Sequence, residues 1–553
     1  MEQKKEGHPY LTVTIACLLL FFFGFCEKSN LCLASYVYAG IMSILFLAFI
    51  AFHSKPFREH AKNCYFFALT SAYAVGTLIL TRCFNDRVTI LLWAFLLLLV
   101  AVAVALKKYG VLTTQRTVIL LLTAGIAFRF VYVLYTSSNL RQHDVGVWLG
   151  IEGHARYIEY WYENGFVLPD FDVREVFQFY HPPFHHLLMA LFLKILTSLG
   201  MEYLTACEAL QFLPFLYSSL SLVVCLRIFQ WVKLDGLPLL LTFAISCFHP
   251  TFIFLSGYYN NDTLTVLFMF LTILLALQWH REPSLKRILP IALTIGFGMM
   301  TKFSVWMIAL AVAFLFLSKF MENGAPKLRL FGQYFLFGII CIPLGLWWPI
   351  RNFFAFGVPI TYIPSLGKMA PQYCGDVSTL RRILDFGSGR LKYVYIAFQE
   401  YGAPFNDFNP ALSLIKTSLF DEEVNVSYFP SLKFTGPCLL ALWICLCILC
   451  TVSFFAIMIR KSRSMDEPTR SFFFLLATAM IVFYYVFCFS YPFVCTMNIR
   501  YCVPLIPLFA MGHGLCMQEF SGKSTLGKLW KSASLILTIL FCLASCIVYT
   551  QIG

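Results

Sequence analysis

The most regular feature of the chain is a series of long apolar runs separated by short polar segments. A helix needs about 20 mostly apolar residues to cross the hydrocarbon of a bilayer. By this measure the pattern predicts an all-α protein with fifteen membrane-spanning helices. The predicted spans are residues 10–26, 33–52, 64–82, 89–106, 117–136, 208–231, 236–256, 263–279, 288–300, 303–318, 331–350, 436–459, 471–490, 501–517 and 532–550.

Two long stretches between these runs, residues 137–207 and 351–435, are rich in aromatic, proline and acidic residues, and we expect both to be folded. The predicted organisation has four N-terminal spans of unassigned role in residues 1–110. Residues 111–350 form a core that contains the first long stretch. Residues 351–435 form a second loop region, and residues 436–553 contain the C-terminal spans.

Composition supports this interpretation. Only 12% of the 553 residues are charged and 59% are hydrophobic, with a mean hydropathy of +0.76, whereas soluble domains carry about 25% charged residues. A soluble multidomain enzyme and a disordered chain are both excluded. The 20 cysteines lie mostly singly within apolar runs, with no metal-binding spacing.

The net charge of +13 is an orientation signal. Cytoplasmic loops of membrane proteins are rich in Lys and Arg. With the N-terminus inside, more than half of the 41 Lys and Arg fall in inner segments and few in the short outer loops. The apolar run at residues 184–199 would invert every later loop if it crossed, so we predict a juxtamembrane or re-entrant outer helix there.

Six polar clusters then lie at the outer membrane rim, where ionisable groups are candidates for function. They are His143-Asp144, His181-Pro182-Pro183, Asn260-Asn261-Asp262, Thr301-Lys302, Arg351-Asn352 and Asn498-Arg500-Tyr501.

Structural roles are open for several of these residues. Asp144 could cap a helix predicted over residues 145–162, whose glutamates, such as Glu159, would form a solvated face. Asp262 could cap its own span. Lys302 and Arg500 could be anchors that extend to the interface.

The alternative is catalysis on a lipid-linked phosphate donor, whose phosphate lies at the depth of these clusters. A carboxylate, Asp144, would act as general base toward an acceptor hydroxyl. Cations would hold the phosphate and stabilise charge on the leaving group. The candidates for this second role are Lys302, Arg351 and Arg500.

In this order the motifs resemble those of C-type (GT-C fold) glycosyltransferases. The chain is similar to the protein O-mannosyltransferases and, more distantly, to the lipid A aminoarabinose transferases. The resemblance covers about residues 117–517. It is carried by His143-Asp144, Tyr180-His181-Pro182-Pro183, Asn261-Asp262-Thr263-Leu264, Thr301-Lys302-Phe303-Ser304, Trp347-Trp348-Pro349-Ile350-Arg351-Asn352 and Arg500-Tyr501-x-x-Pro504.

The resemblance implies inverting transfer from a polyprenyl-phosphate sugar to a glycan, lipid or protein acceptor. It implies Asp144 as the base, Asp262 as a second site carboxylate and His181 at or near the donor phosphate. Further candidates for substrate contacts are His143, Asn261, Asn352 and Tyr501. No cofactor is expected, a divalent metal is not indicated, and the expected partners are the donor, the acceptor and the bilayer, without nucleic acid.

Two departures favour a bacterial-type member over a eukaryotic O-mannosyltransferase. Those enzymes carry Asp-Glu where this chain has Asp144 followed by Val145, and the chain lacks their soluble domain. The expected location is the cell membrane, or the endoplasmic reticulum in a eukaryotic host. A lipid or sugar transporter and a polymerase or ligase with a polyprenyl-diphosphate donor remain alternatives.

Overall fold

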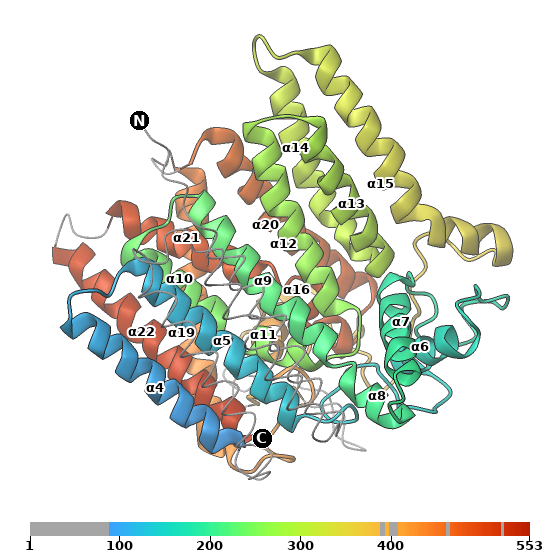
Figure 1. The fold of residues 1–553 in the computed structure, drawn as a ribbon, viewed down its shortest axis with the longest axis horizontal. Helices are drawn as coiled ribbons and strands as arrows, with labels where there is room; N and C mark the ends of the chain where they lie inside the picture. The colour runs from blue at the N-terminus through green and yellow to red at the C-terminus, as the bar shows by residue number, and fades with distance from the viewer. Residues whose placement is uncertain (1–87, 388–392, 397–406, 461–464, 521–524, 553) are drawn as a thin grey trace.

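A computed structural model describes residues 88–387, 393–396, 407–460, 465–520 and 525–552 (Figure 1). In this part of the chain the secondary structure is helical, with one isolated β-bridge between Tyr373 and Phe493. The predicted all-α fold is therefore confirmed. The predicted spans 10–26, 33–52 and 64–82 lie outside the described residues.

The helices follow the apolar runs closely along the chain. In order they are α4 (Val88–Lys108), α5 (Thr114–Tyr135), α6 (Gly153–Glu163), α7 (Phe184–Ser198), α8 (Tyr203–Ala209), α9 (Phe212–Trp231), α10 (Gly236–Phe248), α11 (Pro250–Phe254), η2 (Leu255–Gly257), α12 (Asp262–Arg281), α13 (Leu285–Thr301), η3 (Phe303–Val305), α14 (Trp306–Met321), α15 (Lys327–Phe356), α16 (Thr379–Leu384), α18 (Pro410–Phe420), α19 (Leu432–Ile459), α20 (Glu467–Ser490), η4 (Val494–Thr496), η5 (Ile499–Tyr501), α21 (Leu505–Phe520) and α22 (Thr525–Gln551).

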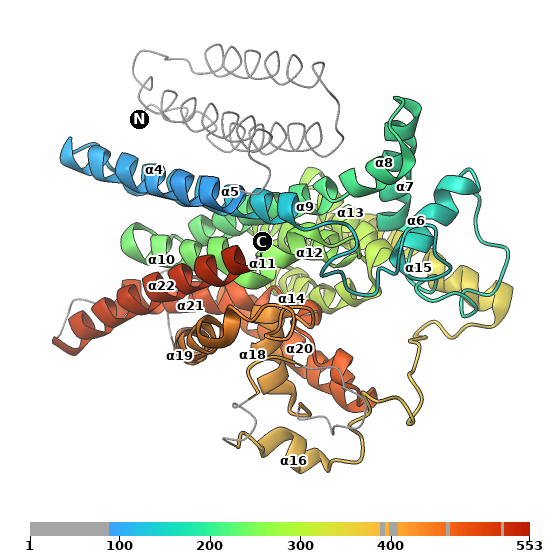
Figure 2. The same cartoon turned by 90° about the horizontal axis from the view of Figure 1, so that it is seen from below.

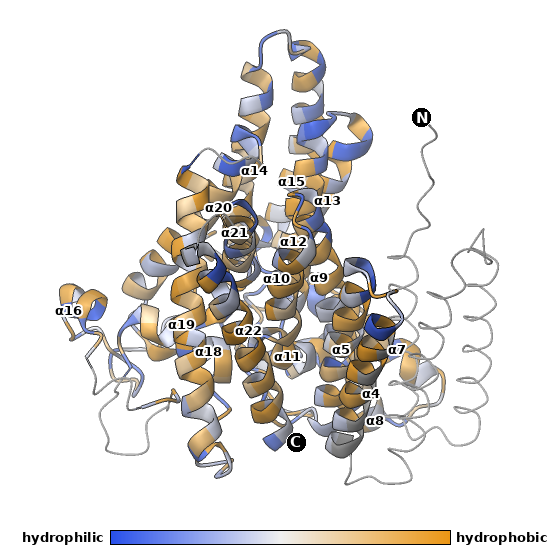
Figure 3. Cartoon of the chain, turned by 90° about the vertical axis from the view of Figure 1, so that its left-hand side faces the viewer, coloured by the Kyte–Doolittle hydropathy of each residue, from blue (hydrophilic) through white to orange (hydrophobic). Residues whose placement is uncertain are grey.

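The chain is a multi-pass membrane protein. Within the described ranges, 8 helices are long and apolar enough to cross a bilayer, or up to 10 if each of two bent helix pairs is one span. Twelve of the fifteen predicted spans fall in these ranges, and the full count of fifteen stays a prediction. Figure 3 shows apolar colour along the helices and polar colour at the α14–α15 connection, at the end of the molecule opposite the C-terminus.

The first bent pair joins α10 to α11 and η2 at an angle of 51°. His249 is the break, followed by Pro250, which begins α11 and cannot donate a backbone hydrogen bond. The buried Arg129 of α5 lies at this break and donates to the carbonyls of Ser246 and Cys247 at 3.3 and 2.7 Å. Carbonyls freed at a helix break inside a membrane protein need such partners.

The second bent pair joins η4 and η5 to α21 at 54°. Its outer part is held by the second loop region, because Cys374 N donates to Pro492 O at 2.8 Å and Val494 N donates to Gln372 O at 3.0 Å. The first bent pair ends at Gly257, a short loop before Asp262, and the second contains Arg500; both residues belong to the predicted site.

Helices α6, α7 and α8 form a layer at one side of the bundle, at the lower right of Figure 1. Helix α7 occupies the predicted outer run, and its 15 residues give it a length of about 22 Å, less than the hydrocarbon thickness. In Figure 2, α16 and α18 lie on the opposite side of the molecule from α4 and α5.

Candidate active site

Five of the predicted site residues, from four separated segments, lie close together. His143 and Asp144 lie in the loop after α5, Asp262 is the first residue of α12, and Lys302 follows α13. Arg500 lies in η5, on the outer side of the second helix break. The structure brings these residues into one network of ion pairs.

Asp262 and its two cations form the buried part of this network. The Asp262 carboxylate pairs with Lys302 Nζ through one oxygen and with Arg500 Nη1, at 3.2 Å, through the other. The side chains of Asp262, Arg500 and Lys302 are 1%, 4% and 12% exposed. Lys302 and Arg500 are therefore not anchors extending to the interface, and Asp262 does more than begin its helix.

Asp144 is the accessible carboxylate of the network, with 39% of its side chain exposed. Its Oδ2 lies 3.1 Å from His143 Nε2 and 3.9 Å from Arg500 Nη1. The backbone has φ +56°, a conformation that few non-glycine residues adopt. Helix α6 begins only at Gly153, so Asp144 does not cap it, and the predicted helix over 145–162 is wrong in its first half.

The loop between Asp144 and α6 closes tightly on itself. A Cβ on Gly146 would lie 2.4 Å from Glu152 O, and one on Gly153 would lie 2.4 Å from Val145 O. His154 N also donates to Asp144 O at 3.1 Å. These contacts require glycine at both positions, and they fix the backbone that carries Asp144.

Glu159 corrects another expectation. It was predicted to lie on a solvated face, but it is fully buried in α6. Its Oε1 accepts hydrogen bonds from Leu149 N at 2.6 Å and from the Tyr203 hydroxyl at 2.8 Å. This carboxylate therefore joins the loop after Asp144 to α8.

His143 lies between two carboxylates. Its Nδ1 is 3.0 Å from Glu422 Oε2, while its Nε2 faces Asp144. Burial and Arg500 lower the pKa of His143, but Asp144 and Glu422 outweigh them and raise it to about 10. Burial alone would raise the pKa of Asp144, but His143 and Arg500 hold it well below its usual range. Both groups are thus charged near neutral pH.

Asp421 and Glu422 form an acidic corner after α18, which Asn498 and Tyr258 hold by hydrogen bonds. Asn498 Nδ2 donates to Glu422 Oε1 at 2.9 Å and to Asp421 Oδ1 at 2.7 Å, and the Tyr258 hydroxyl donates to the other oxygen of Asp421. Asn498 Oδ1 accepts from Arg500 N at 3.0 Å. The corner therefore connects the loop that carries Asp144 with the segment that carries Arg500.

The sequence interpretation missed Glu422 and Asp421, because too many polar residues of 351–435 were candidates to be ranked. One signal was present: residues 421–423 form the longest run of acidic residues in the chain. Asn498 belonged to the predicted outer cluster but not to the predicted site.

A metal ion has one candidate site among the described residues. Ligand atoms of His143, Asp421 and Glu422 all lie within 4.8 Å of one another. Hydrogen bonds from Asn498 and Tyr258 already satisfy both carboxylates without an ion. Arg500 lies between Asp144 and Asp262, so the cation at this pair is its guanidinium.

His181 belongs to a second, neutral group of histidines. Its ring stacks on His154 with centroids 5.6 Å apart, and His154 stacks in turn on His186 of α7 at 5.1 Å. Burial lowers the pKa of His181 to about 3, with a further contribution from the charge of Lys302. His181 therefore faces the charged network as a neutral imidazole.

Tyr501 and Asn261 lie beside the network. The Tyr501 ring lies 5.0 Å from Lys302 Nζ. The Asn261 side chain donates to Thr301 O at 2.8 Å, which joins the beginning of α12 to the end of α13. This contact positions Asp262 and Lys302 relative to each other.

Arg351 and Asn352 make their described contacts elsewhere on the outer side. Arg351 donates to Asn352 Oδ1 at 2.8 Å and to Pro169 O, and its guanidinium lies over the rings of Trp348 and Phe356. The structure does not bring this pair into the ion-pair network. Trp348 Nε1 donates to Tyr180 O at 3.2 Å, which leaves an aromatic layer between Arg351 and His181.

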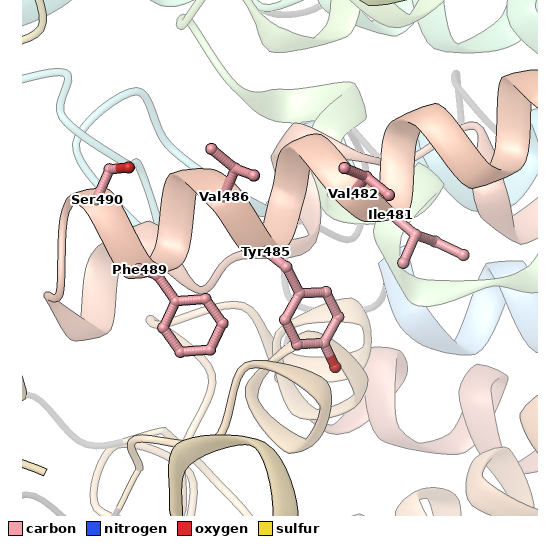
Figure 4. Close-up of a pocket in the computed structure, with 6 residues that line it drawn as sticks. All are labelled: Ile481, Val482, Tyr485, Val486, Phe489 and Ser490. Atoms are coloured by element: carbon pink, nitrogen blue, oxygen red, sulfur yellow. The ribbon is translucent and has the colours of Figure 1, made fainter. Parts of the chain in front are cut away.

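A shallow apolar pocket of about 560 Å³ lies along the outer half of α20 (Figure 4). Tyr485 and Phe489 point to one side of it, and Val482, Val486 and Ser490 to the other. Phe487 of the same helix packs on Tyr501 with ring centroids 4.8 Å apart. The helix that carries this pocket thus contacts the charged network.

No protein-family model matches this sequence, and no match is found among curated proteins. Among solved structures the chain is similar to archaeal oligosaccharyltransferases and to ArnT, at low sequence identity. One is the oligosaccharyltransferase AglB from Archaeoglobus fulgidus, solved with an inhibitory peptide and a dolichol-phosphate, at 12% identity and a TM-score of 0.45. The match covers 80% of this chain and 56% of AglB.

The apo form of the Archaeoglobus fulgidus oligosaccharyltransferase gives 14% identity and a TM-score of 0.44, over 78% of this chain and 55% of that one. ArnT from Cupriavidus metallidurans in the apo state gives 13% identity and a TM-score of 0.45, over 79% of this chain and 76% of ArnT. The chain thus spans little more than half of the oligosaccharyltransferases. The similarity concerns the general course of the helices and identifies no residue.

Proposed function

We propose that the protein is a membrane glycosyltransferase that moves a sugar from a polyprenyl-phosphate donor to an acceptor on the outer face, with inversion at the anomeric carbon. The observation that carries this proposal is the pairing of an accessible, ionised carboxylate, Asp144, with a buried cation, Arg500. Arg500 Nε is a buried donor without a hydrogen-bond partner among the described residues. A phosphate oxygen is a suitable acceptor for it.

Asp144 acts as general base in this proposal. The acceptor hydroxyl approaches the exposed side of the carboxylate, and its oxygen attacks the anomeric carbon of the sugar. A carboxylate with a low pKa is a weak base, so it takes the proton as the new C–O bond forms and the acceptor oxygen becomes acidic. A single displacement at this carbon inverts its configuration.

Lys302 and Arg500 receive the leaving group. When the bond between the anomeric carbon and the phosphate oxygen breaks, its electron pair stays on the phosphate, and the two cations stabilise that charge. Asp262 holds both cations in place before the donor arrives, which avoids rearrangement during the reaction. His181, as a neutral imidazole, contributes a hydrogen bond to the phosphate.

The polyprenyl chain lies in the apolar pocket of α20 in this proposal (Figure 4). Phe487, on a different face of that helix from the pocket, packs on Tyr501, whose ring lies 5.0 Å from Lys302 Nζ. In this proposal the polyprenyl chain therefore passes around α20 to bring its phosphate to the network. Arg351 and Asn352 remain candidates for contacts with the donor or the acceptor at the rim. The reaction takes place at the outer face of the cell membrane, or at the lumenal face of the endoplasmic reticulum in a eukaryotic host.

The test uses the purified full chain in nanodiscs, with radiolabelled polyprenyl-phosphate mannose, glucose or aminoarabinose as donor and membranes of the host cell as the source of acceptor. We expect one donor to be consumed, with release of polyprenyl phosphate and a product linkage of opposite anomeric configuration. Lys302→Met and Arg500→Met should weaken donor use, and Lys368→Met, an exposed outer cation, is the matched control.

Retention of configuration would exclude the single displacement. If none of the three donors loses its sugar, transfer from these lipid-linked donors is excluded. Movement of an intact labelled donor across the bilayer, without release of sugar, would instead identify a transporter.

A further inference from the structure

Glu422 has no part in the reaction proposed above, but it contacts His143, which in turn contacts the proposed base Asp144. Glu422 is a buried carboxylate that follows α18, and it does not touch the exposed side of Asp144. Its two oxygens have separate partners. Oε2 faces His143 Nδ1 at 3.0 Å, and Oε1 accepts from Asn498 at 2.9 Å.

His143 connects Glu422 to Asp144. Both ring nitrogens of His143 are engaged by carboxylates, at 3.0 and 3.1 Å. The imidazole therefore has no free nitrogen for a substrate atom, and it is a bridge between the two acids. A doubly protonated imidazole donates through both nitrogens, which fixes the plane of the ring.

The contact with His143 restricts the orientation of the Asp144 carboxylate. Its other ion pair, with Arg500, is long at 3.9 Å, and 39% of its side chain is exposed. A half-exposed carboxylate would otherwise rotate about its side-chain bonds. His143 is thus the nearest described group that restricts the carboxylate, and Glu422 restricts His143.

We propose that Glu422 is a positioning residue which, through His143, fixes the direction of the Asp144 carboxylate toward the acceptor hydroxyl. This inference rests on the proposed role of Asp144 as base. The rigid support of Glu422 is Asn498, which also binds Asp421 and the backbone of Arg500. Asn498 therefore supports both the orientation of the Asp144 carboxylate, through Glu422 and His143, and the backbone of Arg500. Supporting contacts of this kind can matter greatly, because misplacement of a reacting group by about 1 Å can cost about 100-fold in rate.

The test is a double-mutant cycle on donor turnover by the full chain, with Glu422→Gln, His143→Gln and the double variant. We expect Glu422→Gln to lower kcat by about 10- to 100-fold with a donor KM within about twofold of wild type. If Glu422 acts through His143, the double variant should be no slower than His143→Gln alone, because coupled residues give non-additive effects.

Two further variants control for folding and charge. Glu423→Gln removes a carboxylate one position along that forms no ion pair with His143 among the described residues, and its kcat should fall far less than that of Glu422→Gln. Glu422→Asp keeps the charge and should recover part of the lost kcat. If Glu422→Gln does not fold, Glu422→Asp and His143→Gln give the same comparison of kcat with KM.

Several results would overturn the proposal. These are additive effects of Glu422→Gln and His143→Gln, a normal kcat in Glu422→Gln, or an equal loss in Glu423→Gln. Recovery of Glu422→Gln by added Mn²⁺ or Mg²⁺ would assign Glu422 to a metal site instead. Full activity in Asp144→Asn would refute the proposed base itself, whereas an inactive Asp144→Asn beside a normal Glu422→Gln would refute the positioning role alone.

Discussion

Two groups of histidines, buried or partly buried, differ in charge. His143 lies between Asp144 and Glu422, and these carboxylates raise its pKa to about 10. His181 and His185 lie in the layer around α6 and α7, where burial lowers their pKa values to about 3 and about 4. Burial favours the neutral form in both groups, and the presence of carboxylates decides the outcome.

The difference separates two roles. The charged histidine joins the network of the proposed base and cations. The neutral histidines pack as flat aromatic groups, with His154 Nδ1 and His186 Nε2 at 2.8 Å and the His185 ring nitrogen 2.8 Å from Tyr259 O. Variants and pH changes should therefore affect the two groups in opposite ways.

The largest expected effect is on the charged group. Asp144→Asn should lower sugar transfer by about 10²- to 10⁴-fold, the usual contribution of a general base, while the protein stays folded. Turnover and the melting temperature of the detergent-solubilised protein measure the two quantities. Asp376→Asn, which removes an exposed outer carboxylate, should leave turnover within twofold of wild type.

Arg500→Lys should give the next largest effect. Lysine would replace a guanidinium, whose Nη1 faces Asp262 and Asp144 and whose Nε is a further buried donor, by a single point charge. We expect kcat/KM to fall by about 10- to 100-fold, in the range reported for a misplaced group. Arg174→Lys, at an exposed pair with Asp172, is the matched control. A similar loss in both variants would contradict the role of the bridge.

Acid should destabilise the protein through the neutral histidines. Their folded pKa values lie below the unfolded value of about 6.5, so the unfolded state binds more protons below that pH. For His181 and His185 stability is therefore lost as pH falls from about 6.5 toward about 3 and about 4. Each group contributes up to about 1.4 kcal/mol per pH unit. Melting temperatures from pH 7 to 4 should fall less steeply in His185→Gln than in wild type.

Alkali should act on His143 with the opposite sign, as the smallest effect. Its folded pKa of about 10 lies above the unfolded value, so its stabilisation is complete at low pH and is lost as pH rises from about 6.5 to about 10. Between about pH 6.5 and about pH 10 the melting temperature of the wild-type protein should fall further than that of His143→Gln. Equal slopes would mean that His143 is neutral in the folded protein.

Much of the fold could be predicted because the bilayer imposes a simple rule. Apolar length predicted the helices and bent pairs from α5 to α22 that are able to cross a bilayer. That residues 184–199 do not cross stays a prediction from the distribution of Lys and Arg. The boundaries of α6 were not predictable. The run 145–162 has a helical pattern, but positive φ values at Asp144, Gly146 and Leu149 form a loop that a periodicity argument does not detect.

The site was partly predictable for the same reason. Charges such as Asp262, Lys302 and Arg500 are costly at a membrane rim, so they stood out from apolar neighbours. Glu422 did not stand out, because it lies in an outer region where polar residues are common. The burial that makes it important arises only when the second loop region packs on the end of the bundle.

The sequence by itself determined that this is a multi-pass helical membrane protein, which ends of its helices carry charge and which residues are available for chemistry there. Only the tertiary structure decided which charges pair. Asp144, Asp262, Glu422 and Arg500 are far apart along the chain, and the packing of loops and helix ends brings each within 4 Å of a partner. Coulombic interaction depends on distance and burial, and both are properties of the packed fold rather than of the order of residues.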